Sequence, residues 1–439
     1  MVEVKEEQEK KARALLIGSP ASKDDGCPKE LAGLVDTLGM EMAGSIVLSR
    51  IEPSPAYGIG KGKVQEISDK AKEIQADCII FDWELGPTKQ RNWENLTQIP
   101  VFDRNEVIIR IFAQRAKTKE AVLQVDLARL IYSLPRLSHT YGDLSRQRGG
   151  AFGNKGQGET QLELDRRQIE DKIVQIKKEL EQVEMNRSTQ RRQRMRTATL
   201  SCALVGYTNA GKSSLLNALT GADAFVEDKL FATLDPTTRK LALSEGSSVL
   251  LTDTVGFISN LPHTLIDAFK STLEEASYAD LLLVTVDSSD RDCIKQYNQV
   301  LKVLKEIKAD SVPRLVLLNK CDKVAGVEGA DEVFASELHN AFPEAIRVSA
   351  KTQEGFEQLL AAITEALYGK VESYRIPMAD CALVELVRKN GKILKEEWSA
   401  DYIELEARIS GPIDSDGKAS TRTKALLSAY IVHGGRKNE

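Results

Sequence analysis

One eight-residue segment constrains the fold more than any other part of this 439-residue chain. It reads Gly206-Tyr207-Thr208-Asn209-Ala210-Gly211-Lys212-Ser213 and matches the pattern G-x-x-x-x-G-K-[ST]. The segment follows the apolar run SCALVG and opens the helical run SLLNAL, which is the strand–loop–helix context that the pattern requires. Its glycines let backbone N–H groups wrap a phosphate beside a positive helix N-terminus. A chance glycine-rich turn is the alternative, but the flanks favour a phosphate-binding loop.

Three further segments follow in order, each at the end of an apolar run that is expected to form a strand, the last run being AIRVSA at 345–350. They are Asp253-Thr254-Val255-Gly256, Asn319-Lys320-Cys321-Asp322 and Ser349-Ala350-Lys351. An aspartate at the carboxyl end of a strand can hold Mg²⁺ through water, and the Gly256 N–H can sense a γ-phosphate. The Asp322 carboxylate can accept both hydrogens of the guanine N1–H and N2–H₂ edge, which adenine lacks. The set therefore predicts GTP rather than ATP, with the Ser349 segment closing over the base.

Lys212, Gly256 and a threonine are expected to act directly on the phosphates. Lys212 neutralises the β- and γ-phosphates, and Ser213 offers its hydroxyl to Mg²⁺. The threonine should fold over the metal ion when a γ-phosphate is present. We favour Thr233, within Phe231-Ala232-Thr233-Leu234-Asp235, for this role. The other candidates are Thr237 and Thr238.

Two positions bear on how fast GTP would be hydrolysed. Where Ras-like enzymes have a glutamine that orients the attacking water, this chain has Phe257, which neither donates nor accepts a hydrogen bond. Asn209 can place K⁺ against the phosphates where other GTPases use an arginine finger. A turn-forming asparagine is an equally good interpretation of Asn209.

The rest of the chain predicts three more regions around a domain with a mostly parallel sheet and helices on both faces. Short β-rich runs near residue 14 and from Ser45, Cys78 and Val101 alternate with helical runs at 63–75 and 106–115, which indicates a small α/β domain. Apolar residues at helical spacing, followed by a run from 159 to 196 with almost no Gly or Pro, predict a long antiparallel helical hairpin. The C-terminal part predicts alternating strands from Cys381 and a final helix near 423–432, a small α+β domain. The predicted boundaries are 1–118 for the N-terminal domain, 119–197 for the hairpin, 198–370 for the GTP-binding domain and 371–439 for the C-terminal domain.

The hairpin carries two basic clusters. The stretch between its helices is glycine-rich and holds Arg146, Arg148 and Lys155 beside Tyr141 and Phe152. Such a loop can approach a phosphate backbone closely and offer aromatic rings for stacking. Each cluster alone would be a solvated surface, but the two together favour RNA. The second cluster contains Arg187, Arg191, Arg192, Arg194 and Arg196.

Composition places few limits on function but several on location. The net charge is −5, no apolar run approaches the ~18 residues that cross a bilayer, and the charged N-terminus lacks the apolar core of a secretory signal. We therefore expect a cytoplasmic protein without a membrane span, and a monomer. The scattered cysteines favour buried, reduced thiols over a zinc site or disulfides. They are Cys27, Cys78, Cys202, Cys293, Cys321 and Cys381.

In these motifs the chain resembles the HflX family of ribosome-associated GTPases, within the Obg–HflX group. The resemblance covers nearly the whole chain and is carried by YGIGKGKVQEI, LPRLSHTYGDLSRQRGG, GETQLELDRR, GYTNAGKSSLLNALT, DKLFATLDPTTR, LTDTVGFISNLPH and NKCD. It implies binding to the large ribosomal subunit with the hairpin loop on rRNA near the peptidyl transferase centre, and separation of stalled or stressed ribosomes into subunits. It also implies stimulated GTP hydrolysis that depends on Mg²⁺.

The resemblance assigns roles residue by residue. It implies Ser213 and Thr233 as magnesium ligands, and it implies nucleotide contacts from the loop, the switch and the three strand-end segments. One departure concerns the hairpin loop, where Lys155-Gly156-Gln157-Gly158-Glu159-Thr160 lacks the family's usual proline. The family also implies adenine-nucleotide binding in the N-terminal domain, for which Gly60-Lys61-Gly62-Lys63 is the only phosphate-like pattern, and a plain turn is the simpler interpretation.

Three functions fit these observations. The leading one is a GTPase whose hydrolysis times its release from the ribosome, including splitting or rescue under stress. The second is a ribosome assembly factor in which GTP gates access of the hairpin to rRNA. The third is a switch whose helical hairpin binds a protein.

The missing glutamine predicts slow intrinsic hydrolysis by the isolated protein. With Phe257 at that position, single-turnover hydrolysis is expected on the order of 10⁻³ per second until a partner completes the site. Many turnovers per second by purified protein alone would contradict this. Rates in KCl and NaCl distinguish the two interpretations of Asn209, because only the K⁺ role predicts a faster reaction in KCl.

Overall fold

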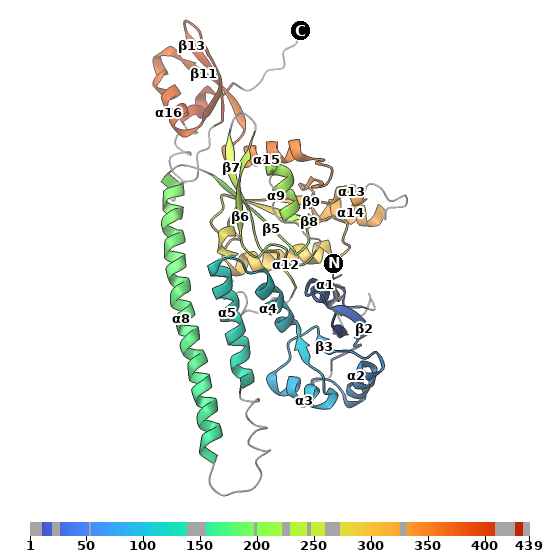
Figure 1. Cartoon of the computed structure of the whole chain (residues 1–439). Coiled ribbons are helices and arrows are strands. Elements are labelled where there is room, and N and C mark those ends of the chain that lie inside the picture. Colours follow the sequence, from blue (N-terminus) through green and yellow to red (C-terminus); the bar gives the residue numbers. More distant parts are fainter. Residues whose placement is uncertain are drawn as a thin grey trace, which may run out of the picture. The chain divides into compact units, whose positions relative to one another are not determined.

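The computed structural model describes residues 11–19, 27–51, 54–137, 155–196, 200–221, 229–243, 247–259, 273–324, 332–408 and 426–432 (Figure 1). The chain forms two compact units. The first comprises residues 1–188 with 227–235 and 260–271, and the second comprises residues 189–226, 236–259 and 272–439.

The first unit contains a parallel sheet of four strands in the order β2-β1-β3-β4. The strands expected near residues 14, 78 and 101 are confirmed. The strand expected from Ser45 instead begins at Glu41 and ends at Val47. This strand lies at the edge of the sheet, and its side chains are exposed or half-buried, so its first residues do not form a continuous apolar run. The strands are β1 (Arg13–Gly18), β2 (Glu41–Val47), β3 (Cys78–Phe81) and β4 (Val101–Asp103).

Four helices accompany this sheet. The second and fourth match the expected helices, whereas the first and third were not predicted. The third is polar apart from a few residues, starts at a proline and buries Trp93 against Phe81 and Tyr57, so its helical pattern is weak in sequence. The helices are α1 (Lys29–Thr37), α2 (Lys61–Glu73), α3 (Pro87–Thr97) and α4 (Arg104–Arg115).

The two long hairpin helices are confirmed. Helix α5 (Lys119–Ser133) continues into the 3₁₀ turn Leu134–Arg136, and α8 spans Lys155–Arg196, 42 residues or about 63 Å. Figure 1 shows the two helices running in opposite directions, and Lys119 Nζ lies 3.7 Å from Glu179 Oε2. Of the α8 side chains that the structure describes, none is buried, so the apolar face of this helix is only half covered. Residues 138–154 of the predicted RNA-binding loop lie outside the described residues. The expectation that Lys155 to Gly158 also belong to the loop is wrong, because α8 already begins at Lys155.

The second unit contains a sheet of six strands in the order β10-β9-β8-β5-β7-β6. All neighbouring pairs are parallel except β6–β7, which is antiparallel. Strand β6 was not predicted, because its residues were included in the switch segment. The last strand was predicted at 345–350, but the observed strand covers only Ile346 and Arg347. The strands are β5 (Ser201–Gly206), β6 (Thr237–Ala242), β7 (Ser248–Asp253), β8 (Leu281–Asp287), β9 (Arg314–Asn319) and β10 (Ile346–Arg347).

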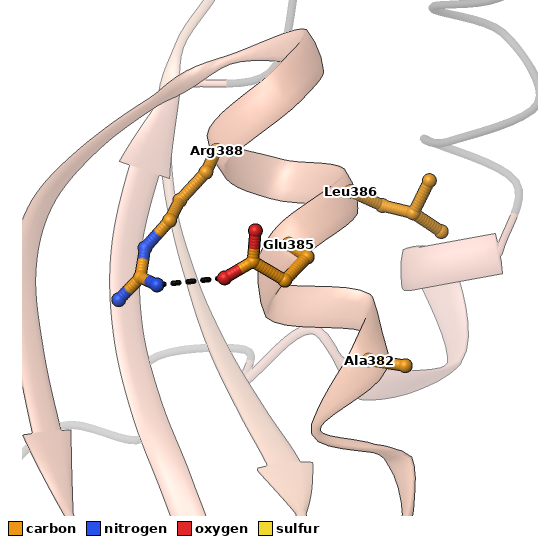
Figure 2. Close-up of a pocket in the computed structure, with 4 residues that line it drawn as sticks. All are labelled: Ala382, Glu385, Leu386 and Arg388. Carbon is orange, nitrogen blue, oxygen red and sulfur yellow. Dashed lines mark hydrogen bonds and ion pairs between the residues drawn. The ribbon is translucent and has the colours of Figure 1, made fainter.

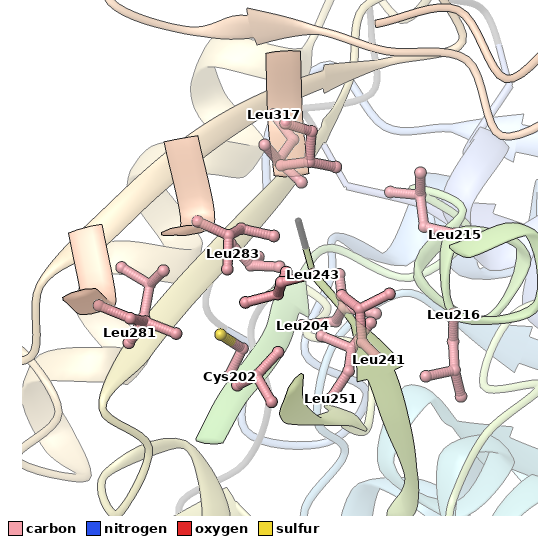
Figure 3. Close-up of a cluster of buried hydrophobic side chains, with 14 of the residues drawn as sticks. Cys202, Leu204, Leu215, Leu216, Leu241, Leu243, Leu251, Leu281, Leu283 and Leu317 are labelled. Atoms are coloured by element: carbon pink, nitrogen blue, oxygen red, sulfur yellow. The ribbon is translucent and has the colours of Figure 1, made fainter. Parts of the chain in front are cut away.

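Helices cover both faces of this sheet, as predicted. Helices α9 (Lys212–Thr220) and α15 (Phe356–Tyr368) share one buried cluster with alternate residues of β5, β7, β8 and β9 (Figure 3). Helices α12 (Cys293–Glu306) and α14 (Glu332–Ala341) pack with the opposite side chains of β8 and β9. This layered arrangement fixes the carboxyl ends of the parallel strands at one edge. Two short helices, α13 (Cys321–Val324) and the 3₁₀ turn Glu274–Ala276, complete this part.

The C-terminal part of the second unit is an antiparallel sheet, β11 (Val371–Pro377), β13 (Tyr402–Arg408) and β12 (Lys392–Trp398), with helix α16 (Ala382–Asn390). The predicted strand from Cys381 is wrong. Val384 and Val387 are three residues apart and both buried, which is the spacing of a helix face. The predicted final helix ends at Tyr430, since Ile431 pairs with Tyr374 in a β-bridge.

A surface hollow of about 560 Å³ lies along α16 (Figure 2). Its lining includes Ala382, Leu386 and the ion pair between Arg388 Nη1 and Glu385 Oε1 at 2.8 Å. These residues lie outside every motif that predicts chemistry.

The cysteines only partly follow the expectation of burial. Cys78, Cys202, Cys293 and Cys321 are buried, Cys27 is half-buried and Cys381 is exposed. Among the described residues, no helix has the length and apolar character needed to span a membrane.

Candidate nucleotide-binding site

The turn between β5 and α9 is built on two glycines that no other residue can replace. Gly206 has φ +154°, and a Cβ there would lie 2.3 Å from the Thr285 carbonyl oxygen. Gly211 has φ +90°, and its Cβ would lie 2.3 Å from Asn319 Nδ2. Both distances are far inside van der Waals contact, so the turn requires glycine at both ends. The predicted phosphate-binding loop is therefore a tight strand–turn–helix connection.

Lys212 folds back over this loop. Its side chain is buried, and Nζ donates to the carbonyl oxygens of Tyr207 at 2.8 Å and Gly206 at 3.2 Å. Burial lowers the pKa of the Lys212 ammonium from 10.5 to about 8, while the nearby Asp253 carboxylate opposes this change. At pH 7 about nine-tenths of the group remains charged. A desolvated cation at a helix N-terminus is suited to bind phosphate.

Ser213 and Asp253 provide a set of hard oxygen donors. Ser213 Oγ donates to Asp253 Oδ2 at 2.6 Å, and Asp253 is the last residue of β7. The next residue is also fixed, because Thr254 Oγ1 donates to the Leu204 carbonyl oxygen at 2.7 Å. Hydroxyl and carboxylate oxygens are the ligands that Mg²⁺ prefers. These residues therefore fit a magnesium ion beside the loop.

Gly256 touches the loop and Lys212 directly. A Cβ on Gly256 would lie 2.8 Å from Thr208 Cα and 3.0 Å from Lys212 Nζ. Thr208 is buried, and within the described part of the chain its Oγ1 has no hydrogen-bond partner. A buried hydroxyl left without a partner costs about 1–3 kcal/mol. A phosphate oxygen next to Lys212 would supply that partner, so the cradle fits a polyphosphate.

Asn319 and Lys320 connect the base-recognition segment to the loop. Asn319 Nδ2 donates to Ala210 O at 2.9 Å, and Asn319 Oδ1 accepts from Ala350 N at 3.2 Å. Lys320 adopts φ +62°, and its Nζ donates to Asn209 O at 2.8 Å and pairs with Asp287 Oδ2 at 2.6 Å. The two side chains thereby hold together three segments that are far apart in sequence.

Asp322 is oriented by Ser349. Ser349 Oγ donates to Asp322 Oδ1 at 2.7 Å and accepts from Thr352 N at 3.1 Å and Lys351 N at 3.3 Å. The half-buried carboxylate is thus positioned by the segment expected to close over the base. Cys321 is buried, so only its backbone can face a nucleotide.

The predicted switch residues, 231–235, belong to the first unit. Phe231 is buried with φ +55°, and its ring meets Phe112 of α4 edge-on with centroids 4.7 Å apart. Leu234 is also buried, whereas Ala232 and Thr233 are half-buried. These contacts connect the switch segment to the N-terminal helices.

Asp235 caps helix α5. Its Oδ1 accepts from Thr118 Oγ1, and its Oδ2 accepts from the backbone N–H groups of Lys117 and Thr118 at 3.3 Å each. Thr118 itself is the N-cap of α5 and accepts from Ala121 N at 3.1 Å. A carboxylate at this position is favoured by the helix dipole. Nothing in the sequence pattern indicated this role for Asp235.

Two of the three candidate switch threonines lie in a strand. Thr237 and Thr238 belong to β6, where Thr238 Oγ1 lies 2.9 Å from Thr252 Oγ1. Their ladder pairing with β7 holds them in the sheet. Thr233 lies in no helix or strand and stays the better candidate.

Sequence reasoning missed the residues that hold the segment after Gly256. The prediction for Phe257 concerned only its side chain, which cannot orient water. The structure shows that its backbone N–H and C=O are hydrogen-bonded to the loop residues on both sides of Tyr207. Ser259, which meets the Tyr207 hydroxyl, was not considered. Neither contact belongs to a motif, so no signal in a single sequence would have indicated it.

Comparison with known proteins gives matches along the chain. A family described as GTP-binding GTPase N-terminal matches residues 28–113, GTP-binding GTPase Middle Region matches 115–194, and 50S ribosome-binding GTPase matches 201–320. A GTPase HflX from Caldanaerobacter subterraneus subsp. tengcongensis is 42% identical over 412 residues, which is 93% of each chain. A GTPase HflX from Akkermansia muciniphila is 43% identical over 93% of this chain and 96% of its own. A solved GTP-binding protein from Sulfolobus solfataricus in complex with GDP is 27% identical, with 81% of this chain and 98% of that one covered and a TM-score of 0.43.

The buried Lys212 ammonium leads to a prediction for the stability of the protein without nucleotide. Because its folded pKa of about 8 is below the usual 10.5, the cost of burying the charge is fully present below pH 8. That cost disappears as the pH rises from 8 towards 10.5. Lys212→Met removes the charge at every pH. We therefore expect this variant to be more stable than the parent at pH 7, by on the order of 2 kcal/mol, and to lose the advantage at higher pH.

Urea unfolding of both proteins at pH 7 and pH 9.5, without nucleotide, measures this difference. An advantage of equal size at the two pH values, or a more stable parent at pH 7, would show that the ammonium is not destabilised by burial.

Proposed function

The chain belongs to the HflX family of GTPases, and from that premise we propose that it couples GTP binding and hydrolysis to splitting or rescue of the ribosome through the large subunit. Guanine nucleotides are its ligands, and all the proposed nucleotide contacts except those of residues 231–235 come from the second unit. A ribosomal partner implies a cytoplasmic location, and a monomer is sufficient for this activity.

The proposal that the protein binds GTP is supported by the position of four sequence motifs, which lie together at one edge of the sheet. The Lys212 ammonium, the Ser213–Asp253 pair and the Ser349–Asp322 pair are linked through Asn319 and the loop backbone. Lys212 and the loop N–H groups bind the phosphates, and the Asp322 carboxylate reads the guanine edge. Gly256, in contact with Lys212, is the group that distinguishes a triphosphate from a diphosphate.

Mg²⁺ fits the oxygen donors of this site. Ser213 and Thr233 are the proposed ligands, with Asp253 acting through water. When bound, the ion neutralises charge on the β- and γ-phosphates. Asn209 adopts φ +59°, a conformation that favours a turn-forming role, and K⁺ remains the alternative tested by the KCl and NaCl rates.

The ribosomal part is supported by the description of the matched domain, 50S ribosome-binding GTPase, and by the charge of the hairpin. Arg146, Arg148 and Lys155 lie in or beside the glycine-rich stretch. Cationic residues on a narrow projection can follow a phosphate backbone, with an affinity that falls steeply with salt. The loop is therefore proposed as the rRNA contact.

Sucrose-gradient sedimentation with a non-hydrolysable GTP analogue tests this function. We expect the protein to migrate with mature large subunits and the monosome peak to decrease. Migration with precursor subunits would instead indicate assembly, and absence from all ribosomal fractions would exclude both roles and favour a protein-binding hairpin.

A matched pair of variants makes the test specific for the loop. Alanine at Arg146, Arg148 and Lys155 is expected to reduce co-sedimentation at least tenfold at moderate salt, since each phosphate contact contributes to affinity. The control replaces Lys172, Lys177 and Lys178, which are exposed on α8, and removes the same charge. Equal effects of the two triple variants would mean that the interaction depends only on net charge.

A further inference from the structure

Backbone hydrogen bonds join the phosphate-binding loop to the segment that follows β7. Phe257 N donates to Gly206 O at 3.1 Å, and Thr208 N donates to Phe257 O at 2.7 Å, which makes a parallel β-bridge between Tyr207 and Phe257. Next to the bridge, the Tyr207 hydroxyl accepts from Ser259 N at 2.7 Å and lies 2.6 Å from Ser259 Oγ. We call the Tyr207–Ser259 pair the tyrosine latch.

The tyrosine latch is largely shielded from water, with Ser259 itself half-buried. Tyr207 is 7% exposed, and Phe257 and Ile258, which precede Ser259, are 1% and 0% exposed. A tyrosine hydroxyl can accept one hydrogen bond while it donates another, so it can serve both Ser259 groups at once. Because Tyr207 is buried, water replaces a bond lost here less readily than it would at the protein surface. The latch therefore holds Ser259 in one position.

Gly256 lies between two anchored points. On its N-terminal side, Thr254 is bonded to β5 through its hydroxyl. On its C-terminal side, Phe257 is bonded to the loop backbone and Ser259 to the latch. Gly256 itself packs against Thr208. The amide of Gly256 cannot move away from the loop unless the contacts on its C-terminal side break.

We propose that Tyr207 is a positioning residue: through Ser259, its hydroxyl fixes the Gly256 amide where a γ-phosphate oxygen binds. This inference rests on the proposed GTPase function. Phe257 has no polar group to orient water, so on this side of the site the protein offers backbone dipoles. Such dipoles are effective only when they are held in place before the reaction.

The position of Gly256 matters for a triphosphate and not for a diphosphate, which has no γ-phosphate. Tyr207→Phe removes one hydroxyl and leaves the loop backbone intact. We expect the affinity for GDP to stay within about twofold of the parent. The affinity for the analogue GMPPNP and the single-turnover rate of GTP hydrolysis should each fall about three- to tenfold, as for loss of one ordinary hydrogen bond.

Ser259→Ala tests the other half of the latch. It keeps the Ser259 N–H bond and is expected to have a smaller effect in the same direction. The double variant should fall no further than Tyr207→Phe, because both changes act through one contact. A strictly additive double variant would contradict a shared latch.

Tyr368→Phe is the matched control. Its hydroxyl donates to Ser248 O at 3.3 Å at the opposite end of β7. This variant should change the melting temperature without changing the ratio of GDP to GMPPNP affinity. Binding and melting measured on all variants therefore separate positioning from stability.

Three results would overturn the role of Tyr207. A folded Tyr207→Phe with the parent's affinity ratio and rate overturns the proposal, and so does an equal loss of GDP and GMPPNP affinity. If Tyr207→Phe does not fold, Ser259→Ala carries the same test, and an unchanged ratio overturns the proposal. A parent protein that binds neither nucleotide would overturn the proposed GTPase function instead, which makes the two failures distinguishable.

Discussion

The nucleotide site depends on the close approach between the turn after β5 and the residues Thr285 of β8 and Asn319 of β9. Gly206 lies against the Thr285 carbonyl and Gly211 against Asn319, so a single added carbon at either position would separate these segments. The approach lets the Lys212 ammonium bond to loop carbonyls and lets Asn319 bond to Ala210. Without it, the phosphate-binding loop would not be bonded to the base-recognition segment.

The sequence predicted the central elements well, because their signals are local and strong. The apolar run of β5 ends at the first glycine of the loop and those of β7, β8 and β9 end at polar residues, and parallel strands bring those ends together. The order of the motifs along the chain was therefore enough to predict which residues meet. The long helix α8 was equally clear, since it contains no proline over 42 residues.

The errors in the predicted helices and strands have a common physical origin. In each case the pattern of apolar residues is too short or too weak to identify the element. The run from Cys381 contains enough β-branched and apolar residues to suggest a strand, but Val384 and Val387 pack on one face of a helix against the sheet. Strand β6 is half-exposed and polar, so it looked like a loop. Helix α3 has one large buried side chain, Trp93, and little periodicity. Tertiary packing determines the conformation of all three segments, and a single sequence does not show those packing contacts.

The switch segment shows the same limit at the level of function. Asp235 was expected near the nucleotide, and the structure describes it as a cap on helix α5. Phe231 packs on Phe112 in the same unit. These contacts connect the residues expected to respond to the γ-phosphate with the helix that leads into the glycine-rich stretch. A carboxylate at a helix N-terminus contributes roughly 0.3–1 kcal/mol, small enough for a bound ligand to compete with it.

In the proposed site, Asp322, oriented by Ser349, recognises guanine while the loop around Lys212 binds the phosphates. Asp322→Asn is the sharpest test of this recognition, because an amide can donate to the 2-oxo group of xanthine where a carboxylate accepts from the 2-amino group of guanine. Titration of the purified proteins in magnesium buffer should show that the parent binds GDP and not XDP, and that the variant reverses this preference by at least about a hundredfold. A variant that still binds GDP as tightly as the parent, or a parent without affinity for GDP, would contradict the account.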